Sequence, residues 1–279
     1  MVGPEAKRSA VAMLLELQKF KRHRACRLAG LGESTYYYKP SDRRSDEPLK
    51  AKLVEFSQLR PRWGCPRIFD LARRNGLADN YKRIERIYSE AGLSLKLRRR
   101  KKKKGNRRLV LTKPTKANEI WSMDFMQDQL FDGRRFRTFN VVDEFTRENL
   151  VIDVNRSIRS LRVVEILNQV IKLRGKPNVI ICDNGPEFDS QAVDVWAFQN
   201  GVKISFIDPG KPVQNAYIES FNGKFRDECL DANWFTCLEH ARLTIEVWRH
   251  DYNHHRPHSS LNYKTPNEFA KEQEAMLAS

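Results

Sequence analysis

The sequence predicts an α/β fold built on one mixed sheet and preceded by a separate all-α region. From Asn118 onward, segments of strand and helix periodicity follow in the order βββαβαβα, which is typical of a mixed sheet covered by helices. Before that residue, only helical periodicities and a run of basic residues occur. The charge changes at the same place: residues 1–118 carry 32 Lys and Arg against 11 Asp and Glu, whereas the remaining residues carry 19 against 24.

Length and composition exclude several classes of protein. A chain of 279 residues is long enough for two domains and a sizeable core. No apolar run approaches the thickness of a bilayer, and the N-terminal segment is typical of an amphipathic helix, not of a signal peptide. The five cysteines contain no CxxC pair, which disfavours a disulfide framework and favours a reducing cytoplasm. The net charge of +16, concentrated in the first part of the chain, favours nucleic acid as a partner.

Residues 1–45 are expected to form a short helical segment with the outline of a helix-turn-helix. A helix that ends at Ala29 meets the turn Gly30–Gly32, and Ser34 or Thr35 is suited to cap the next helix. Many helical hairpins share this outline, so a plain hairpin remains the alternative.

Residues 46–95 repeat the outline with three helices and are predicted to be a helix-turn-helix DNA-binding domain. Pro61 and Gly64 end the first helix, and Asn80 is a natural N-cap for the third. The apolar residues of the third helix fall on one side, and the predicted DNA contacts on its other side are Lys82, Arg83 and Arg86. In a helix-turn-helix this third helix lies in the major groove. The alternative is a three-helix bundle with a solvated basic face.

A basic run, KLRRRKKKKGNRR, occupies most of residues 96–117 and joins the two predicted domains. Like charges repel one another, so we expect an extended linker in which Arg98, Arg99 and Arg100 contact DNA phosphates. A localisation signal is the alternative interpretation of such a run.

Residues 118–279 carry the α/β periodicities, in the element order of a ribonuclease-H-like domain. The predicted elements are strands 120–130, 134–145 and 149–154, helix 157–175, strand 179–182, a helix through Val193 and Trp196, strand 203–207, a helix from about residue 215, and a last helix at 238–257. A turn at Asp132-Gly133 joins the first two strands as a hairpin. Leu161 is one of six apolar residues that recur at helical spacing in helix 157–175, and Phe198 lies on the same helix as Val193 and Trp196.

Two acidic residues lie where ligands gather in an open α/β sheet. Asp183 follows the apolar strand 179–182, and Asp124 lies in the first strand on the face opposite to Trp121 and Met123. In this topology the first strand is central and runs beside strand 179–182, so the two carboxylates can approach one another.

Glu219 is the third candidate, with 35 residues between it and Asp183. The apolar stripe of its helix is Ile218, Phe221 and Phe225. Glu219 shares another face with Asn222, a possible accessory residue, and can reach the sheet edge if the stripe is buried. Asp143 competes for the third position: it either assists the site or only caps a turn.

Three clustered carboxylates repel one another unless cations lie between them. Oxygen ligands without a His or Cys shell suit Mg²⁺ or Mn²⁺ better than Zn²⁺. Two such ions about 4 Å apart can activate an attacking oxygen and stabilise a leaving oxygen in a phosphoryl displacement. We therefore predict two ions held by Asp124, Asp183 and Glu219. A zinc site at His254, His255 and His258 is disfavoured because these residues lack convergent partners.

Five segments carry a resemblance to a known family: WSMDF, FNVVDEFTRE, ICDNGPEF, PGKPVQNAYIESFNGKFRDECL and DYNHHRPHSSL. Together they resemble the catalytic frame of bacterial insertion-sequence transposases, and more narrowly the OrfB product of the family whose transposase is made by frameshifting between two frames. Those proteins belong to the retroviral-integrase superfamily with the D,D(35)E triad. The resemblance implies an integrase catalytic core preceded by a helix-turn-helix region, with the triad at Asp124, Asp183 and Glu219.

The resemblance also implies a reaction and its partners. Water activated at the metal ions would cut one strand at an element end, and the released 3′-OH would attack another phosphodiester. The expected partners are double-stranded DNA of the terminal inverted repeats and of the target, further copies of the chain on DNA, and the upstream-frame product as a fusion partner, with no membrane. Lys211, Lys224 and Arg226 are candidate phosphate contacts. The expected location is the bacterial cytoplasm, at the nucleoid when DNA is bound.

Two other functions remain open from the sequence. A DNA-binding regulator with a vestigial nuclease-like core would bind the element end without metal-dependent nicking. A structure-selective nuclease on the same fold would cut DNA without needing terminal repeats.

Overall fold

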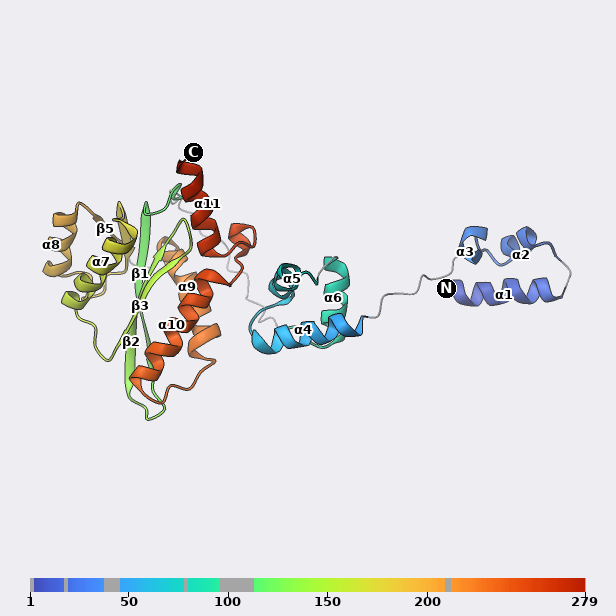
Figure 1. The fold of residues 1–279 in the computed structure, drawn as a ribbon, viewed down its shortest axis with the longest axis horizontal. Helices are drawn as coiled ribbons and strands as arrows, with labels where there is room; N and C mark the ends of the chain where they lie inside the picture. The colour runs from blue at the N-terminus through green and yellow to red at the C-terminus, as the bar shows by residue number, and fades with distance from the viewer. Residues whose placement is uncertain are drawn as a thin grey trace. The chain divides into compact units, whose positions relative to one another are not determined.

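The computed structural model describes residues 3–17, 20–37, 46–77, 80–95, 113–208 and 212–278 (Figure 1). The chain divides into two compact units, Met1–Ala51 and Lys52–Ser279. Four of the predicted DNA contacts, namely Arg98, Arg99, Arg100 and Lys211, lie outside the described residues, as does most of the predicted basic linker.

Three of the described helices lie wholly within the first unit: α1 (Pro4–Glu16), α2 (Arg22–Leu28) and α3 (Glu33–Tyr37). Its small core consists of Val11, Ala25, Cys26 and Leu31. The chain leaves α2 through Gly30, whose φ of +61° suits a residue without a side chain. Two helices joined by a glycine-containing turn are therefore present as predicted, whereas DNA binding by this segment stays a prediction.

Three further helices follow: α4 (Glu47–Leu59), α5 (Cys65–Arg74) and α6 (Tyr81–Glu90). The side chain of Asn80 caps α6 by accepting a hydrogen bond of 2.9 Å from the backbone N–H of Lys82. The buried residues of this part include Leu53, Trp63, Ile68, Ala72, Ile84, Ile87 and Tyr88. The predicted N-cap and the predicted inward side of the third helix are both confirmed.

Five strands form one mixed sheet in the order β3-β2-β1-β4-β5. They are β1 (Ile120–Gln129), β2 (Arg135–Asp143), β3 (Asn149–Asn155), β4 (Val179–Cys182) and β5 (Lys203–Phe206). The first three strands pair antiparallel, and β1, β4 and β5 pair parallel. The first strand is therefore central and lies beside the strand that leads to Asp183, as the sequence predicts.

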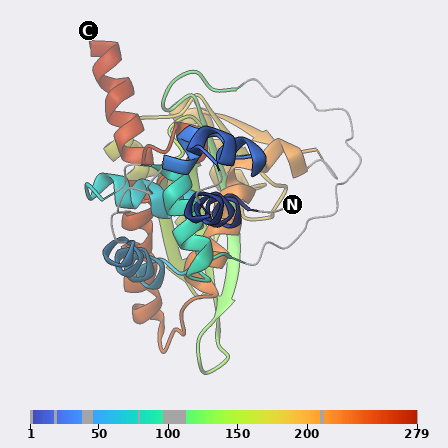
Figure 2. The ribbon, with the colours of Figure 1, turned by 90° about the vertical axis from the view of Figure 1, so that its right-hand side faces the viewer.

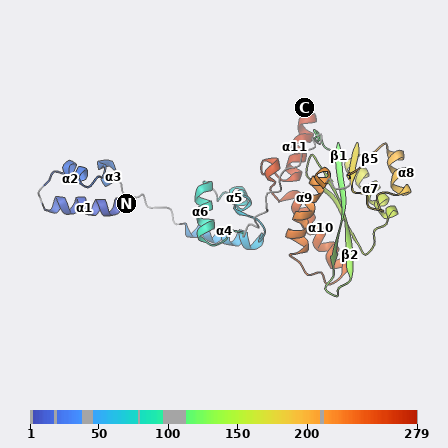
Figure 3. The same ribbon diagram turned by 180° about the vertical axis from the view of Figure 1, so that it is seen from behind.

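Helices cover both faces of the sheet (Figures 1 and 3). On one face, α7 (Ser160–Arg174) and α8 (Gln191–Asn200) pack against a core that includes Trp121 and Met123. On the other face, α9 (Ala216–Phe225) and α10 (Leu238–His254) pack against a second core. The observed order of these elements confirms the predicted βββαβαβα arrangement.

Short elements complete the α/β part. They are the 3₁₀-helices η1 (Pro212–Asn215) and η3 (Ser259–Leu261), the π-helical turn η2 (Arg226–Leu230) and the last helix α11 (Pro266–Ala278). The turn of the β1–β2 hairpin projects at the lower end of the sheet, and α11 leads to the C-terminus (Figure 2).

One apolar residue that was counted in the apolar spacing of α7 is exposed: Leu161 is 70% exposed. The buried positions of α7 are Val163, Ile166, Leu167 and Val170. The placement of Leu161 is wrong because the helix buries one stripe, and a shift of one residue turns a side chain by about 100° around the helix axis. Phe198 lies in α8 as predicted, where the buried residues are Val193, Trp196 and Ala197.

Candidate active site

The strand register brings Asp124 and Asp183 to the same edge of the sheet. In the parallel pairing of β1 with β4, Ser122 lies opposite Ile181. Asp124 and Asp183 each follow two residues later, and side chains two residues apart on a strand share a face. The two carboxylates therefore stand side by side at the C-terminal end of β4, on the face that α9 covers.

Asp124 is held by hydrogen bonds from two directions. The backbone N–H of Phe125 donates to Oδ1 over 2.8 Å, and the Nδ2 of Asn222 on α9 donates to Oδ2 over 2.7 Å. The Nδ2 of Asn140 in turn donates to the Oδ1 of Asn222 over 2.9 Å. Since Asn140 and Asn222 are buried, this chain of side chains fixes both the α9 helix and the orientation of Asp124.

Asn140 was missed by the sequence analysis. It lies directly opposite Asp124 in the antiparallel pairing of β1 with β2. The available signal was the hairpin turn at Asp132. Asp124 and Asn140 are equally far from this turn along the chain, so the two residues pair across the hairpin. An amide placed opposite an acidic residue could have been found in this way.

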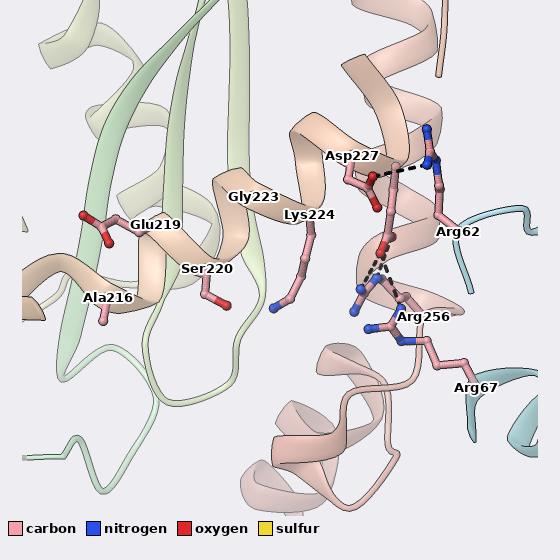
Figure 4. Close-up of a pocket in the computed structure, with 10 residues that line it drawn as sticks. Arg62, Arg67, Ala216, Glu219, Ser220, Gly223, Lys224, Asp227 and Arg256 are labelled. Carbon is pink, nitrogen blue, oxygen red and sulfur yellow. Dashed lines mark hydrogen bonds and ion pairs between the residues drawn. The ribbon is translucent and has the colours of Figure 1, made fainter. Parts of the chain in front are cut away.

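Glu219 lies on the exposed side of α9. Ile218, Phe221 and Phe225 are all buried, as the sequence predicts, and they fix the helix against the sheet. The same helix contributes Asn222 to Asp124, so Glu219 and the two aspartates belong to one region of the surface. In Figure 4 the Glu219 carboxylate points away from Lys224 on the same helix.

The electrostatics of Asp124 show that the three carboxylates interact. The pKa of Asp124 is raised to about 6, first because burial disfavours the charged form and then because the negative charges of Asp183 and Glu219 repel it. The N–H of Phe125 and the amide of Asn222 oppose this rise. A cation placed among these carboxylates would remove the repulsion.

The loop after β4 leaves little space beside Asp183. The N–H of Gly185 donates to the Oδ1 of Asp183 over 3.2 Å, and a Cβ at Gly185 would lie 3.1 Å from the same oxygen. The loop is anchored by the buried ring of Phe188, which stacks on Phe125 with 4.8 Å between ring centres. Glycine is therefore favoured at this position by the approach of the loop to the carboxylate.

The carboxylate of Asp143 accepts hydrogen bonds from three backbone N–H groups. Its Oδ2 accepts a hydrogen bond of 2.7 Å from the N–H of Asn118, and its Oδ1 accepts bonds of 2.8 and 2.9 Å from the N–H groups of Phe145 and Thr146. Of the two roles that the sequence left open for Asp143, these bonds favour turn capping.

The described candidates for DNA contacts differ in their surroundings. Lys82, Arg83 and Arg86 lie on the side of α6 away from its buried residues, and Arg86 pairs with Glu90. Arg226 bonds the end of β1, through Asp128 at 3.1 Å and the carbonyl of Gln127 at 2.6 Å. Lys224 is partly buried and lines a cavity beside α9.

The structure holds no preformed metal cluster in the ranges that it describes: no three His, Cys, Asp or Glu side chains there converge as ligands of one ion. This includes the histidines 250–258, among which His258 is buried and has its pKa lowered well below its usual value by burial and by Arg256. Among the same described residues, no helix has the length and apolar character that a membrane span requires.

Family models and similar proteins both relate this chain to integrases and insertion elements. Two family models, both described as the integrase core domain, match residues 114–212 and 200–266. The chain is 46% identical over 265 residues to the insertion element IS407 uncharacterized 31.7 kDa protein of Burkholderia multivorans, covering 95% of this chain and 96% of the relative. It is 44% identical over 269 residues to the IS476 uncharacterized 39.2 kDa protein of Xanthomonas euvesicatoria, covering 96% and 78%.

More distant relatives extend this likeness. The transposase for insertion sequence element IS904 of Lactococcus lactis is 26% identical over 248 residues, covering 84% of this chain and 98% of the relative. Among solved structures, a simian T-cell lymphotropic virus intasome in complex with a PP2A regulatory subunit matches with a TM-score of 0.50 and 18% identity, covering 79% of this chain and 74% of the matched chain. This structural likeness confirms the predicted fold class.

Proposed function

The chain belongs to the bacterial insertion-sequence transposases of the retroviral-integrase superfamily, and we propose that Asp124, Asp183 and Glu219 are its catalytic triad. As a transposase it is a polynucleotidyl transferase that acts on DNA. The observation that carries the triad is the convergence of three elements: β1 and β4 bring the two aspartates together, and α9 reaches Asp124 through Asn222.

The donor set of the triad fits a hard divalent cation. It consists of carboxylate oxygens. Burial raises the pKa of Asp124 first, and repulsion by Asp183 and Glu219 raises it further; a cation would relieve this repulsion. We propose that two ions of Mg²⁺ or Mn²⁺ would be held by Asp124, Asp183 and Glu219. When bound, such ions activate the attacking oxygen and stabilise the leaving oxygen of a phosphoryl displacement.

The protein's own groups position this chemistry. The N–H of Phe125 and the amide of Asn222 keep the two oxygens of Asp124 in fixed directions, and the N–H of Gly185 does the same for one oxygen of Asp183. The carboxylates are then ready for strand cleavage at an element end and for attack by the freed 3′-OH on a second phosphodiester.

DNA reaches the site from the basic part of the chain in this proposal. Residues 46–95 act as a helix-turn-helix domain, with 1–45 as an accessory helical segment, 96–117 as a basic linker and 118–279 as the catalytic domain. The proposed contacts are Lys82, Arg83 and Arg86 on α6, Arg98, Arg99 and Arg100 in the linker, and Lys211, Lys224 and Arg226 near Glu219. The proposed partners are the terminal repeats, target DNA, further copies of the chain and the upstream-frame product.

The test of the triad uses the purified protein, Mg²⁺ and a labelled duplex that ends in the element's own terminal repeat. We expect strand cleavage by the unchanged protein and a loss of at least about a thousandfold with Asp183→Asn or Glu219→Gln, because the rate depends on charge stabilisation at this site. Asp194→Asn is the matched control, since Asp194 is an exposed carboxylate on α8, which covers the opposite face of the sheet.

Other outcomes separate the alternatives. Cleavage that persists in both triad variants would refute the triad. Binding of the duplex without any metal-dependent nicking would favour a regulator, and equal cutting of duplexes that lack the repeat would favour a structure-selective nuclease.

A further inference from the structure

The cavity beside α9 that Lys224 lines also has Glu219 in its lining (Figure 4). It has a volume of about 590 Å³ and is lined by basic side chains from three separate segments. These are Arg67 on α5, Lys224 on α9 and Arg256, which follows α10. In Figure 4, Arg67 enters from the α5 ribbon while Lys224 descends from α9, and both end in the same space.

Two of the three acidic residues that line this cavity, Glu228 and Asp227, are paired with arginines. Glu228 binds Arg256 with both carboxylate oxygens, at 2.7 and 2.5 Å, and lies 3.6 Å from Arg67. Asp227 stands 3.6 Å from Arg62, and both of these side chains are about half exposed. Glu219 points away from Lys224 in Figure 4. Within the described residues, Lys224 therefore has no carboxylate at ion-pair distance.

The positive charge of Lys224 is poorly compensated. Its pKa is lowered to about 8, first by burial and then by Arg256, with Glu228 as the one opposing charge. The pKa of Arg67 is also lowered, by burial and then by Arg256. Cations that are buried together in this way are stabilised by an anion from outside the chain.

An adjoining cavity supplies an independent sign of a missing partner. It has a volume of about 280 Å³, and its lining includes Lys224, Arg147, Tyr217, Ser220 and His258. The guanidinium of Arg147 lies 3.9 Å from the centre of the Tyr217 ring, and its buried Nη1 has no hydrogen-bond partner among the described residues. An unpaired buried donor of this kind is costly unless a ligand satisfies it.

We propose that these joined cavities form a phosphodiester-binding site for the DNA strand that passes Glu219. Lys224 and Arg67 bind the phosphate oxygens, Arg147 supplies a further donor, and the buried Arg256–Glu228 pair holds the walls in place. This proposal rests on the proposed function, because the bound strand is the one that the triad cuts. Arg67 lies on α5 of the helical part and Lys224 on α9 of the α/β part, so both parts would contact the same strand.

The test measures DNA binding without metal, so that it does not depend on cleavage. The affinity of the full chain for a duplex ending in the terminal repeat is followed as the salt concentration rises. We expect Lys224→Gln and Arg67→Gln to bind roughly tenfold more weakly at low salt and to reduce the salt slope by about 0.9, the value for one lost phosphate contact. Lys224→Arg keeps the charge and should keep the slope.

The matched control is Lys172→Gln, since Lys172 is exposed on α7, which covers the opposite face of the sheet. An unchanged slope and affinity in both Lys224→Gln and Arg67→Gln, with unfolding temperatures like that of the parent, would overturn the proposal. So would competition by inorganic phosphate without any change of slope, which would make the cavity a small-anion site.

The two proposals fail separately. If the parent protein does not cleave but Lys224→Gln lowers the salt slope, the phosphate site stands without the triad. If cleavage depends on the triad but the slope does not depend on Lys224 and Arg67, the triad stands and the phosphate site is wrong.

Discussion

At the residue scale, Asp124 combines two opposed influences. Hydrogen bonds from Phe125 and Asn222 favour its charged form, whereas burial and the charges of Asp183 and Glu219 disfavour it. Burial and repulsion outweigh the hydrogen bonds, because the pKa of Asp124 is raised to about 6 from the usual 3.8. The carboxylate that we propose as catalytic is thus kept at a cost in stability, which is common at catalytic sites.

We predict that Asp124→Asn stabilises the protein near neutral pH in the presence of a chelator. A carboxyl whose pKa is raised by folding contributes stability below its unfolded pKa, and this contribution is lost as the pH rises through about 6. Removing the charge should therefore increase the free energy of unfolding by about 1–2 kcal/mol above that pH. The measurement is thermal or urea unfolding between about pH 4 and pH 8.

The difference between Asp124→Asn and the parent should shrink toward the acidic end of this range. Asp194→Asn, an exposed carboxylate on α8, should show no such trend. A variant that is less stable than the parent near neutral pH would contradict the raised pKa. Added Mg²⁺ should stabilise the parent and leave Asp124→Asn little changed.

At the element scale, α9 and the β1–β2 hairpin are joined by a chain of amides. Asn140 donates to Asn222, and Asn222 donates to Asp124. The apolar stripe of α9 sets the distance of the helix from the sheet, and the two amides set its rotation. A small shift of α9 would therefore move Glu219 and would also change the orientation of Asp124.

We predict that Asn222→Ala and Asn140→Ala each lower the cleavage rate about 10- to 100-fold, as is typical for groups that orient metal ligands. Because Asn140 acts through Asn222, the double variant should cost no more than Asn222→Ala alone. Single-turnover cleavage is the measurement, and Asn200→Ala at the end of α8 is the control. Fully additive losses would show that Asn140 acts by a separate route.

Most of the strands and helices that carry the candidate site were predictable from the sequence. The strand that ends at Asp183 and the stripe Ile218, Phe221 and Phe225 follow from periodicity, since burial selects apolar residues at fixed spacing. Leu161 was misplaced because apolar residues also occur on exposed faces, so composition does not fix the helical phase. Asn140 was missed because strand partners follow from register, which the sequence shows only through the hairpin turn.

At the scale of the second unit, the segment from Arg60 to Arg74 contacts the α/β part through arginine–carboxylate pairs. Arg60 pairs with Asp251 on α10, and Arg74 pairs with Glu268 on α11 at 2.5 Å. Arg74 also donates to the carbonyl of Tyr263 at 3.0 Å. No periodicity predicts these pairs, because their partners are separated by more than half of the chain. They position α5, and with it Arg67, beside Lys224.

We predict that this docking depends on salt. A double-mutant cycle of Arg74→Gln and Glu268→Gln should show a coupling energy of about 0.5–1 kcal/mol at low ionic strength, because the pair is partly exposed and bidentate. Screening should lower this coupling at high salt. Urea unfolding of the full chain measures it, and the exposed pair of Lys52 and Glu55 within α4 provides the control cycle.

The same variants connect docking to DNA binding. If docking positions Arg67 at the phosphate site, Arg74→Gln should lower the salt slope of DNA binding in the parent and have no further effect in the Arg67→Gln background. An equal loss in both backgrounds would mean that Arg74 touches DNA itself. The Arg74 guanidinium already binds two carboxylates, Asp70 at 2.6 Å and Glu268. We therefore expect Arg74→Gln to have no further effect in the Arg67→Gln background.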